Sequence, residues 1–327
     1  MHSLPFEINS IFSIQTDQDF ESKAIAIAQY QYYNNAIYKD YVDLIGRDIN
    51  QLKSVTQIPF LPISFFKSHK IKAFEGEAQL EFHSSGTTGQ QHSRHFIYDE
   101  TIYQMSFLKC FELFFGHPED YIILGLLPSY HDNEHSSLIY MIDHLIELSK
   151  NTESGFLLND YERLISIVNE HQSHKKIIIF GVSYALLDLA EKFNPDLSNC
   201  LVLETGGMKG RRKELTKSEL HAELKTGLQI SMVLSEYGMT ELLSQAYSLG
   251  KEKYRTPPWM KILIREQTDP LSFTTTKSGG INVIDLANIH SCSFIATEDL
   301  GRVNGIDFEI LGRFDQSDIR GCNLLIQ

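Results

Sequence analysis

Cysteine, basic residues and long apolar runs are all scarce in this chain of 327 residues. The four cysteines stand far apart and form no Cys-x-x-Cys pair, which argues against a zinc site and against a disulfide framework. Dispersed thiols fit a reducing compartment, so we expect a cytoplasmic protein. Lys and Arg number 29 against 42 Asp and Glu. The net charge of −13 repels phosphate backbones, so we expect no nucleic-acid partner.

Export and membrane signals are also missing. The first ten residues, MHSLPFEINS, contain neither a basic region nor an apolar core, so we expect no signal peptide. No apolar stretch reaches the length that crosses a bilayer, so we expect no membrane partner. The composition, with 42% hydrophobic and 22% charged residues, is typical of a globular protein that buries a large core.

Strand-like and helix-like segments alternate from about residue 78 onward. Apolar runs predict four buried strands, at residues 121–127, 176–180, 201–204 and 228–234. Helical spacing follows three of these runs, at residues 138–145, 182–192 and 212–224. Such alternation predicts an α/β fold with a mostly parallel sheet covered by helices.

The alternation fades after Pro257 and Pro258, where short strands at 281–285 and 308–311 predict a small β-rich lobe. Residues 18–56, by contrast, have a helical pattern. We therefore expect three parts. They are an N-terminal helical segment at 1–70, an α/β core that binds nucleotide and acyl group at 71–260, and the β-rich lobe at 261–327.

The most informative stretch of the sequence is Ser84-Ser85-Gly86-Thr87-Thr88-Gly89. Its glycines let the backbone curl until successive N–H groups point at one anion, and its hydroxyls add donors without bulk. Both properties suit a polyphosphate cradle. The stretch is not a Walker A loop, because no Gly-Lys-Ser/Thr follows it. A polar hairpin tip between strands at 80–83 and 95–98 explains the composition equally well.

A second polar motif follows the strand expected at 228–234 and reads Ser235-Glu236-Tyr237-Gly238-Met239-Thr240-Glu241. The carboxyl end of a parallel strand is where α/β sheets place ligands. In such a site Tyr237 stacks on a base, Thr240 donates to a phosphate and Glu241 holds Mg²⁺. Taken alone, the segment is more typical of a plain helix N-cap.

Together the two motifs resemble the phosphate loop and the Tyr-Gly-x-Thr-Glu signature of the adenylate-forming superfamily. Three further segments match that superfamily in the same order: Glu204-Thr205-Gly206-Gly207-Met208, Thr297-Glu298-Asp299-Leu300-Gly301-Arg302 and Gly312-Arg313-Phe314-Asp315. The first resembles the loop that lies against the adenine. In the second, the resemblance implies that Asp299 binds the ribose hydroxyls, with Arg302 beside it. In the third, it implies that Arg313 reaches the nucleotide.

The finer resemblance is to the acyl-protein synthetases of the bacterial bioluminescence fatty-acid reductase system (LuxE type). The segments that carry it are residues 58–67, Leu127-Pro128-Ser129-Tyr130, residues 206–211 and Arg320-Gly321-Cys322-Asn323-Leu324. That branch activates a fatty acid with ATP. It then holds the acyl group as a thioester on a cysteine near the C-terminus before a reductase takes it. Cys322 matches that cysteine, although a free cysteine is more often a small buried hydrophobe.

The resemblance implies the N-terminal core of an adenylate-forming enzyme that uses ATP and Mg²⁺ to make acyl-AMP. Such enzymes usually end in a lid domain with a catalytic lysine. Too few residues follow Arg313 for that lid, so we expect it to be absent. Lys209, Arg211 and Arg94 are candidates to supply its charge, and each is equally compatible with a solvated surface position. The acyl acceptor is then Cys322 or the thiol of a partner, either a reductase or a carrier protein.

Three competing interpretations stay open at this point. Gly181-Val182-Ser183-Tyr184-Ala185 follows a strand and opens a helix, as the nucleophile elbow of a serine hydrolase or acyltransferase does, with Asp285 and His290 downstream. His131 and His135 have the spacing of a metal pair, although a loop is the stronger reading. Finally, a non-catalytic partner that only binds nucleotide has the same loops.

Overall fold

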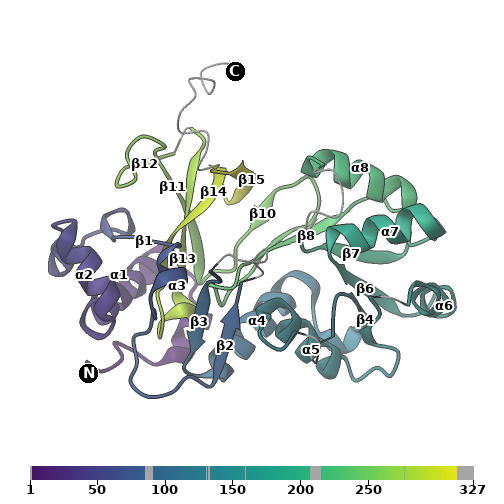
Figure 1. Cartoon of the computed structure of the whole chain (residues 1–327), viewed down its shortest axis with the longest axis horizontal. Helices are drawn as coiled ribbons and strands as arrows, with labels where there is room; N and C mark the ends of the chain where they lie inside the picture. The colour runs from purple at the N-terminus through teal and green to yellow at the C-terminus, as the bar shows by residue number, and fades with distance from the viewer. Residues whose placement is uncertain are drawn as a thin grey trace. The chain divides into compact units, whose positions relative to one another are not determined.

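The computed structural model describes residues 2–84, 91–129, 131, 133–158, 160–206, 215–275 and 277–314 (Figure 1). The chain divides into two compact units. The first unit comprises Met1–Phe65, Ile71–Phe74 and Pro258–Gln327, and the second comprises Phe66–Lys70 and Glu75–Pro257. The three-part division expected from the sequence stays a prediction. No helix of the described ranges is both long and apolar enough to cross a membrane.

The second unit is built on the alternation that the sequence predicts. Its strands stand in the order β10-β9-β8-β7-β6-β4-β5. They are β4 (Tyr121–Leu126), β5 (Gly155–Phe156), β6 (Lys176–Gly181), β7 (Cys200–Glu204), β8 (Leu234–Tyr237), β9 (Ala246–Ser248) and β10 (Tyr254–Arg255). The pairs from β5 to β8 are parallel, and β9 and β10 add antiparallel strands at one side. The predicted α/β fold with a mostly parallel sheet is confirmed.

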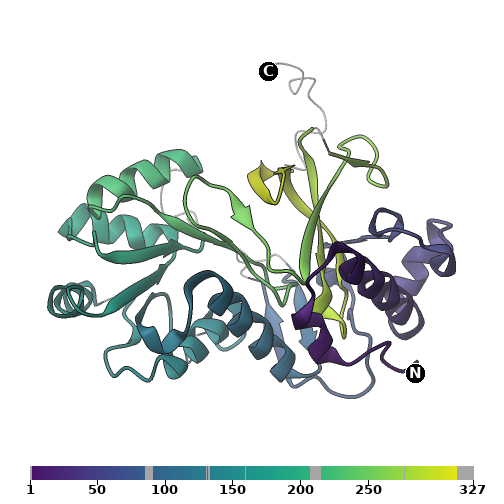
Figure 2. The same ribbon diagram turned by 180° about the vertical axis from the view of Figure 1, so that it is seen from behind.

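Helices cover both faces of this sheet, and a separate hairpin completes the unit. The helices are α4 (Glu100–Phe115), α5 (Ser137–Ser149), α6 (Tyr161–His171), α7 (Ser183–Phe193) and α8 (Lys217–Gly227), with the short η4 (Pro118–Asp120) before β4. Helices α7 and α8 lie on one face, and α4 and α5 lie on the other (Figures 1 and 2). The hairpin pairs β2 (Leu80–His83) with β3 (Arg94–Ile97) in antiparallel register.

Two predicted boundaries in this unit are wrong. The strand expected at 228–234 is instead β8, which begins at Leu234 and ends at Tyr237. The prediction was wrong because apolar residues also occur in the connection between α8 and β8, where Leu228 and Val233 are 0% and 1% exposed. The helix expected from residue 212 begins at Lys217, where Thr216 forms a capping box with Glu219.

The first unit contains the β-rich lobe that the sequence predicts. Its strands are β1 (Leu61–Pro62), β11 (Met260–Arg265), β12 (Phe273–Thr274), β13 (Gly279–Asp285), β14 (Phe294–Asn304) and β15 (Asp307–Arg313). They stand in the order β12-β11-β13-β14-β15 with antiparallel pairing, and β1 adds a parallel strand to β14. The expected strands at 281–285 and 308–311 correspond to β13 and β15.

The N-terminal helices belong to the same unit as these strands. They are α1 (Asp17–Asn34) and α2 (Ala36–Leu44), accompanied by the short η1 (Ile8–Ser13), η2 (Ile49–Gln51) and η3 (Val55–Gln57), while α3 (Phe65–Ser68) follows β1. The fully buried amide of Gln31 donates to Ile289 O at 2.9 Å and accepts from Ser293 N at 3.0 Å. These bonds reach the segment between η6 (Leu286–Asn288) and β14, so α1 and the β-rich lobe share one core.

Candidate functional site

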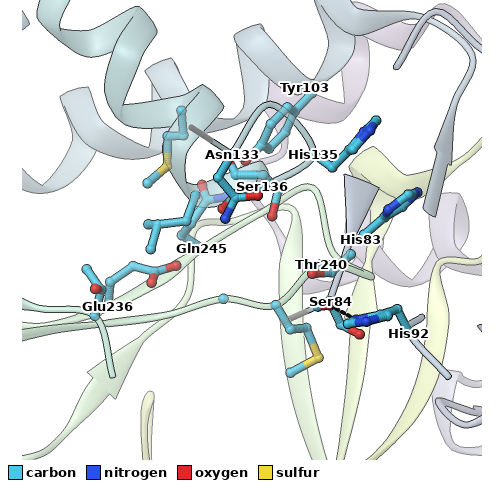
Figure 3. A pocket seen from close by; sticks show the side chains of 16 residues that line it. His83, Ser84, His92, Tyr103, Asn133, His135, Ser136, Glu236, Thr240 and Gln245 are labelled. Atoms are coloured by element: carbon cyan, nitrogen blue, oxygen red, sulfur yellow. Dashed lines mark hydrogen bonds between the residues drawn. The ribbon is translucent and has the colours of Figure 1, made fainter. Parts of the chain in front are cut away.

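A cavity of about 420 Å³ lies in the second unit (Figure 3). Five segments that are distant in sequence contribute to it: the β2–β3 hairpin, α4 through Tyr103, the segment around the start of α5, the end of β7, and β8 with the segment after it. Most of its described lining residues are polar. Among them are Ser84, Thr205 and Thr240, one from each of three motifs that the sequence singles out.

Ser84 enters this cavity at the point where the hairpin closes. Its N–H donates to Ser93 O at 3.1 Å, and its hydroxyl accepts from Ser93 N at 2.9 Å. His92 also bonds the carbonyl of Ser84, at 2.5 Å (Figure 3). The predicted loop therefore starts from a fixed base beside the cavity. Its other members lie outside the described residues: Ser85, Gly86, Thr87, Thr88 and Gly89.

His95 joins this hairpin to the second motif. The side chain is fully buried, and its Nδ1 donates to Thr240 O at 2.7 Å. The ring meets Phe66 edge-on, with 5.7 Å between the ring centroids. Because a carbonyl oxygen only accepts, Nδ1 carries the proton. The two motifs that the sequence predicts to bind phosphate are thus brought together.

The second motif divides between the cavity and the core. Gly238 and Thr240 line the cavity. Tyr237 is 7% exposed and packs edge-on against Tyr254 at 6.1 Å. Glu241 is 5% exposed and is not among the described residues that line the cavity. Base stacking by Tyr237 and metal binding by Glu241 stay predictions.

The end of β7 is held by a buried carboxylate. Glu204 is 3% exposed, and its Oε1 accepts from Ser183 Oγ and from Gly206 N, both at 2.6 Å. Its Oε2 lies 3.6 Å from Lys217 Nζ. Gly206 has a φ of +79°, which favours glycine. The carboxylate thus fixes the Thr205–Gly206 backbone beside the cavity, while Gly207, Lys209 and Arg211 lie outside the described residues.

A second carboxyl, on Glu236, lines the cavity itself. A Cβ added to Gly238 meets its Oε1 at 2.2 Å, so a larger residue at 238 would displace the carboxyl from this position. Burial, together with the charge of Glu204, raises the pKa of Glu236 to about 8, and the charge of Lys217 opposes the shift. The sequence analysis assigns no role to Glu236, although it stands inside the motif.

In the first unit, the strand register brings Asp299 and Arg313 together. These residues pair across β14 and β15, and Arg313 Nε lies 3.4 Å from Asp299 Oδ1. Arg313 also reaches Glu298 Oε2 at 3.4 Å. Arg302 instead donates to Glu309 Oε2 from Nε and Nη2, at 2.8 and 2.6 Å. Their roles toward a nucleotide stay predictions.

The structure gives little support to the competing sites. Ser183 is 2% exposed and its hydroxyl donates to Glu204, so in the described part of the chain it is neither accessible nor bonded to a histidine. His135 stacks on His83 with 4.3 Å between ring centroids. Within the described residues no cluster of His, Cys, Asp and Glu has the makings of a metal site.

The thiols of the described residues are all buried, at Cys110, Cys200 and Cys292. Burial raises the pKa of Cys200 to about 12 and that of Cys292 to about 12. Both are therefore protonated and poor nucleophiles at neutral pH. Cys322 lies outside the described residues. Arg94 is described, and its guanidinium lies over the ring of Phe96 at 5.6 Å.

Comparison with known proteins adds a relative along almost the whole chain. No family model matches the sequence. The chain is similar to the long-chain-fatty-acid–luciferin-component ligase of Aliivibrio fischeri, with 23% identity over 349 residues. The match covers 96% of this chain and 89% of that ligase. The resemblance predicted from the sequence is thus matched by a relative whose name is that of a ligase.

Solved structures agree on the fold. An open conformation of 2-hydroxyisobutyryl-CoA ligase in complex with 2-HIB-AMP and CoA has a TM-score of 0.66 at 12% identity, and the match covers 92% of this chain and 70% of that one. ATP-bound MatB from Rhodopseudomonas palustris has a TM-score of 0.54 at 15% identity, covering 73% of this chain and 49% of that one. This chain thus spans about half the length of the MatB chain. The resemblance predicted from the sequence is therefore confirmed: in sequence the chain is similar to the fatty-acid–luciferin-component ligase, and in fold it is similar to 2-hydroxyisobutyryl-CoA ligase and to MatB.

Proposed function

We propose that this chain activates a carboxylic acid with ATP, giving acyl-AMP and pyrophosphate. One observation carries the proposal. Ser84, at the base of the glycine-rich loop, and Thr240, in the turn after β8, line one cavity, and His95 fastens their two segments together. A loop of backbone donors and a threonine hydroxyl around one cavity suit a triphosphate.

The reaction needs positioning more than proton transfer. An oxygen of the acid attacks the α-phosphorus of ATP, a P–O bond forms, and the bond to pyrophosphate breaks. Because the attacking group is already an anion, the rate enhancement comes from aligning the acid with ATP and from neutralising the phosphate charge. We assign phosphate binding to the loop of residues 84–89 and to Thr240, and contact with the adenine to Gly206 and Gly207. Tyr237 and Gly238 lie beside the base in this scheme.

The remaining assignments concern charge. Asp299 accepts from the ribose hydroxyls, Arg313 and Arg302 add positive charge near the nucleotide, and Lys209 neutralises the departing pyrophosphate. A single carboxylate with phosphate oxygens and water is a donor set that suits Mg²⁺, and Glu241 is the carboxylate we assign to it. When bound, the ion neutralises phosphate charge.

We further propose that the acid is a fatty acid and that the acyl group passes to a thiol. The thiolate attacks the acyl carbonyl, a C–S bond forms, and AMP leaves with the electrons of the C–O bond. The acceptor is Cys322 or a thiol on a partner, either a reductase or a carrier protein. The name of the Aliivibrio fischeri relative supports the fatty acid, and the burial of Cys110, Cys200 and Cys292 supports a thiol elsewhere. The dispersed cysteines also favour a cytoplasmic location.

Acid-dependent release of pyrophosphate from ATP tests the first step. We expect the wild type to release it with a fatty acid and Mg²⁺, and Glu241→Gln to lose that activity. Glu119→Gln makes the same chemical change at an exposed ion pair with Lys150 and serves as the matched control. Full activity in Glu241→Gln would remove Glu241 from the scheme. Absence of release with every acid would favour a non-catalytic nucleotide-binding partner.

Labelled fatty acid tests the second step. With ATP and Mg²⁺ we expect the label to become covalent and to be released by hydroxylamine, as a thioester is. Cys322→Ser abolishes this labelling if Cys322 is the acceptor. Persistent labelling in Cys322→Ser, or none in the wild type without an added partner, assigns the acceptor elsewhere.

A further inference from the structure

The cavity has two chemically different ends. Figure 3 places Ser84 and His92 toward one side, where the glycine-rich loop begins, and Glu236 and Gln245 toward the other. The first side belongs to the phosphate motifs described above. The second side plays no part in the proposed adenylation chemistry, yet it carries two polar side chains from β8 and from the segment before β9.

Each of these side chains has a polar group without a hydrogen-bond partner in the described part of the chain. Gln245 is 4% exposed, and its buried Oε1 has none. No hydrogen bond joins the carboxyl of Glu236 to a described residue, and its Oε1 occupies the space that a Cβ on Gly238 would take. Buried polar groups in native proteins are almost always paired, so an unpaired amide and carboxyl on one cavity wall call for a ligand.

The chemistry of that ligand follows from these groups and from their surroundings. Glu236 is held largely protonated at neutral pH, because burial and the carboxylate of Glu204 raise its pKa to about 8. A protonated carboxyl offers one donor and an acceptor, and the amide oxygen of Gln245 offers another acceptor. Among the carboxyl and the buried unpaired amide oxygen, two atoms accept and one donates, and the nearby charge of Glu204 repels a second carboxylate. The group that fits is a hydrogen-bond donor rather than an anion.

We propose that Glu236 and Gln245 recognise a hydrogen-bond-donating substituent, a hydroxyl or an amino group, on the chain of the acid substrate. This inference rests on the proposed adenylating activity and narrows its substrate class. The reacting carboxylate lies toward Thr240, and the substituent lies at the opposite side of the cavity. Leu138 and Met141 line the same cavity and supply apolar contact for the chain between them.

A plain alkyl chain fits this site poorly. It leaves the buried amide oxygen of Gln245 and the half-buried carboxyl of Glu236 without partners, and a site built to bond a polar group rejects the analogue that lacks it. Gly238 is required for the same recognition, because any larger residue displaces the carboxyl. Glu236 and Gln245 are thus specificity residues, since neither touches the reacting atoms.

ATP–pyrophosphate exchange with matched acids tests the inference. For each chain length, a straight-chain acid is compared with its terminal hydroxy and terminal amino derivatives. We expect one substituted acid to have a kcat/KM higher than the plain acid by about 10- to 100-fold. Glu236→Leu and Gln245→Leu each reduce this ratio, whereas Glu119→Gln leaves it unchanged. Glu236→Gln, which keeps a donor and an acceptor, retains a preference for hydroxyl and loses one for amino.

The outcomes separate this inference from the function on which it rests. If plain acids of every length are activated as well as the substituted ones, the substrate class is wrong while adenylation stands. If no acid supports exchange, both the proposed substrate class and the proposed adenylating activity are wrong. Melting temperatures of Glu236→Leu and Gln245→Leu show whether the variants fold. Should either fail to fold, Gly238→Ala provides the second route, because it displaces the carboxyl without removing it, and an unchanged ratio there would overturn the proposal.

Discussion

The imidazole of His95 donates to the carbonyl oxygen of Thr240 at 2.7 Å, across 145 residues of sequence. This bond ties β3 of the hairpin to the turn after β8. Thr240 belongs to a motif that the sequence singles out for phosphate binding, and His95 lies in the strand that follows the predicted glycine-rich loop. The relationship therefore gives the two motifs a fixed separation before any nucleotide arrives.

Removing this bond should weaken both the fold and the site. In His95→Leu the buried carbonyl of Thr240 loses its donor, which costs about 1–3 kcal/mol in the free energy of unfolding. We expect a lower melting temperature and a higher KM for ATP in the exchange assay. His95→Gln keeps a donor and should recover part of both. A Leu variant with the wild-type KM for ATP would show that the bond does not position the site.

Glu204 should act on nucleotide binding through the backbone that it holds. Glu204→Gln removes the charge that faces Lys217 and weakens the bonds to Ser183 and Gly206. We expect KM for ATP to rise more than kcat falls, because the carboxylate does not contact the reacting atoms. Equal loss in kcat with an unchanged KM would contradict this positioning role.

Ser183→Ala separates the ligase from the serine hydrolase. The substitution removes one hydrogen bond to Glu204, which costs about 0.5–1.5 kcal/mol of stability. We expect acid-dependent exchange to persist and a fluorophosphonate probe to leave wild-type Ser183 unlabelled, because this side chain is 2% exposed. Rapid labelling of Ser183 together with esterase activity would reinstate the hydrolase.

Stability between pH 7 and 8 should report on Glu236. Its pKa is raised from an ordinary value of 4.5 to about 8, so the folded state binds a proton that the unfolded state has released. Stability from this group is therefore present at low pH and is lost as pH rises toward 8. The charged neighbours are Glu204, which raises the pKa, and Lys217, which lowers it.

Glu236→Gln provides the comparison, because it cannot titrate. We expect urea unfolding of the wild type to show a falling free energy of unfolding from pH 7 to 8, and the variant to show a flatter profile. His221, whose pKa burial lowers to about 4, contributes only below pH 6.5, where its effect has the opposite sign. If the free energy of unfolding falls equally with pH in the wild type and in Glu236→Gln, a group other than Glu236 is titrating.

Local patterns were sufficient to predict most of the second unit. Buried parallel strands such as β4 and β6 are continuous apolar runs, and hydrogen bonding between them requires no further signal. The start of β8 was missed because Leu228 and Val233 are equally apolar but lie buried in the connection between α8 and β8. Apolar character indicates burial, and it does not distinguish a strand from a buried turn.

Contacts over long sequence distances were beyond local patterns. Nothing near Gln31 indicates that its amide bonds to Ile289 and Ser293, more than 250 residues later. The same holds in the site. Sequence motifs predicted Ser84 and Thr240 as site residues. Glu236 and Gln245 could be identified only from the structure, because they line the same cavity and each has a polar group without a hydrogen-bond partner among the described residues.

The most direct test of the account is isotope exchange between pyrophosphate and ATP in the presence of an acid. If the hairpin base and the turn after β8 form one triphosphate site, the wild type exchanges label only when acid is present. Thr240→Val, which removes the hydroxyl and keeps the backbone carbonyl that His95 bonds, then loses most of that exchange. Undiminished exchange in Thr240→Val, or no acid-dependent exchange in the wild type, would contradict the account.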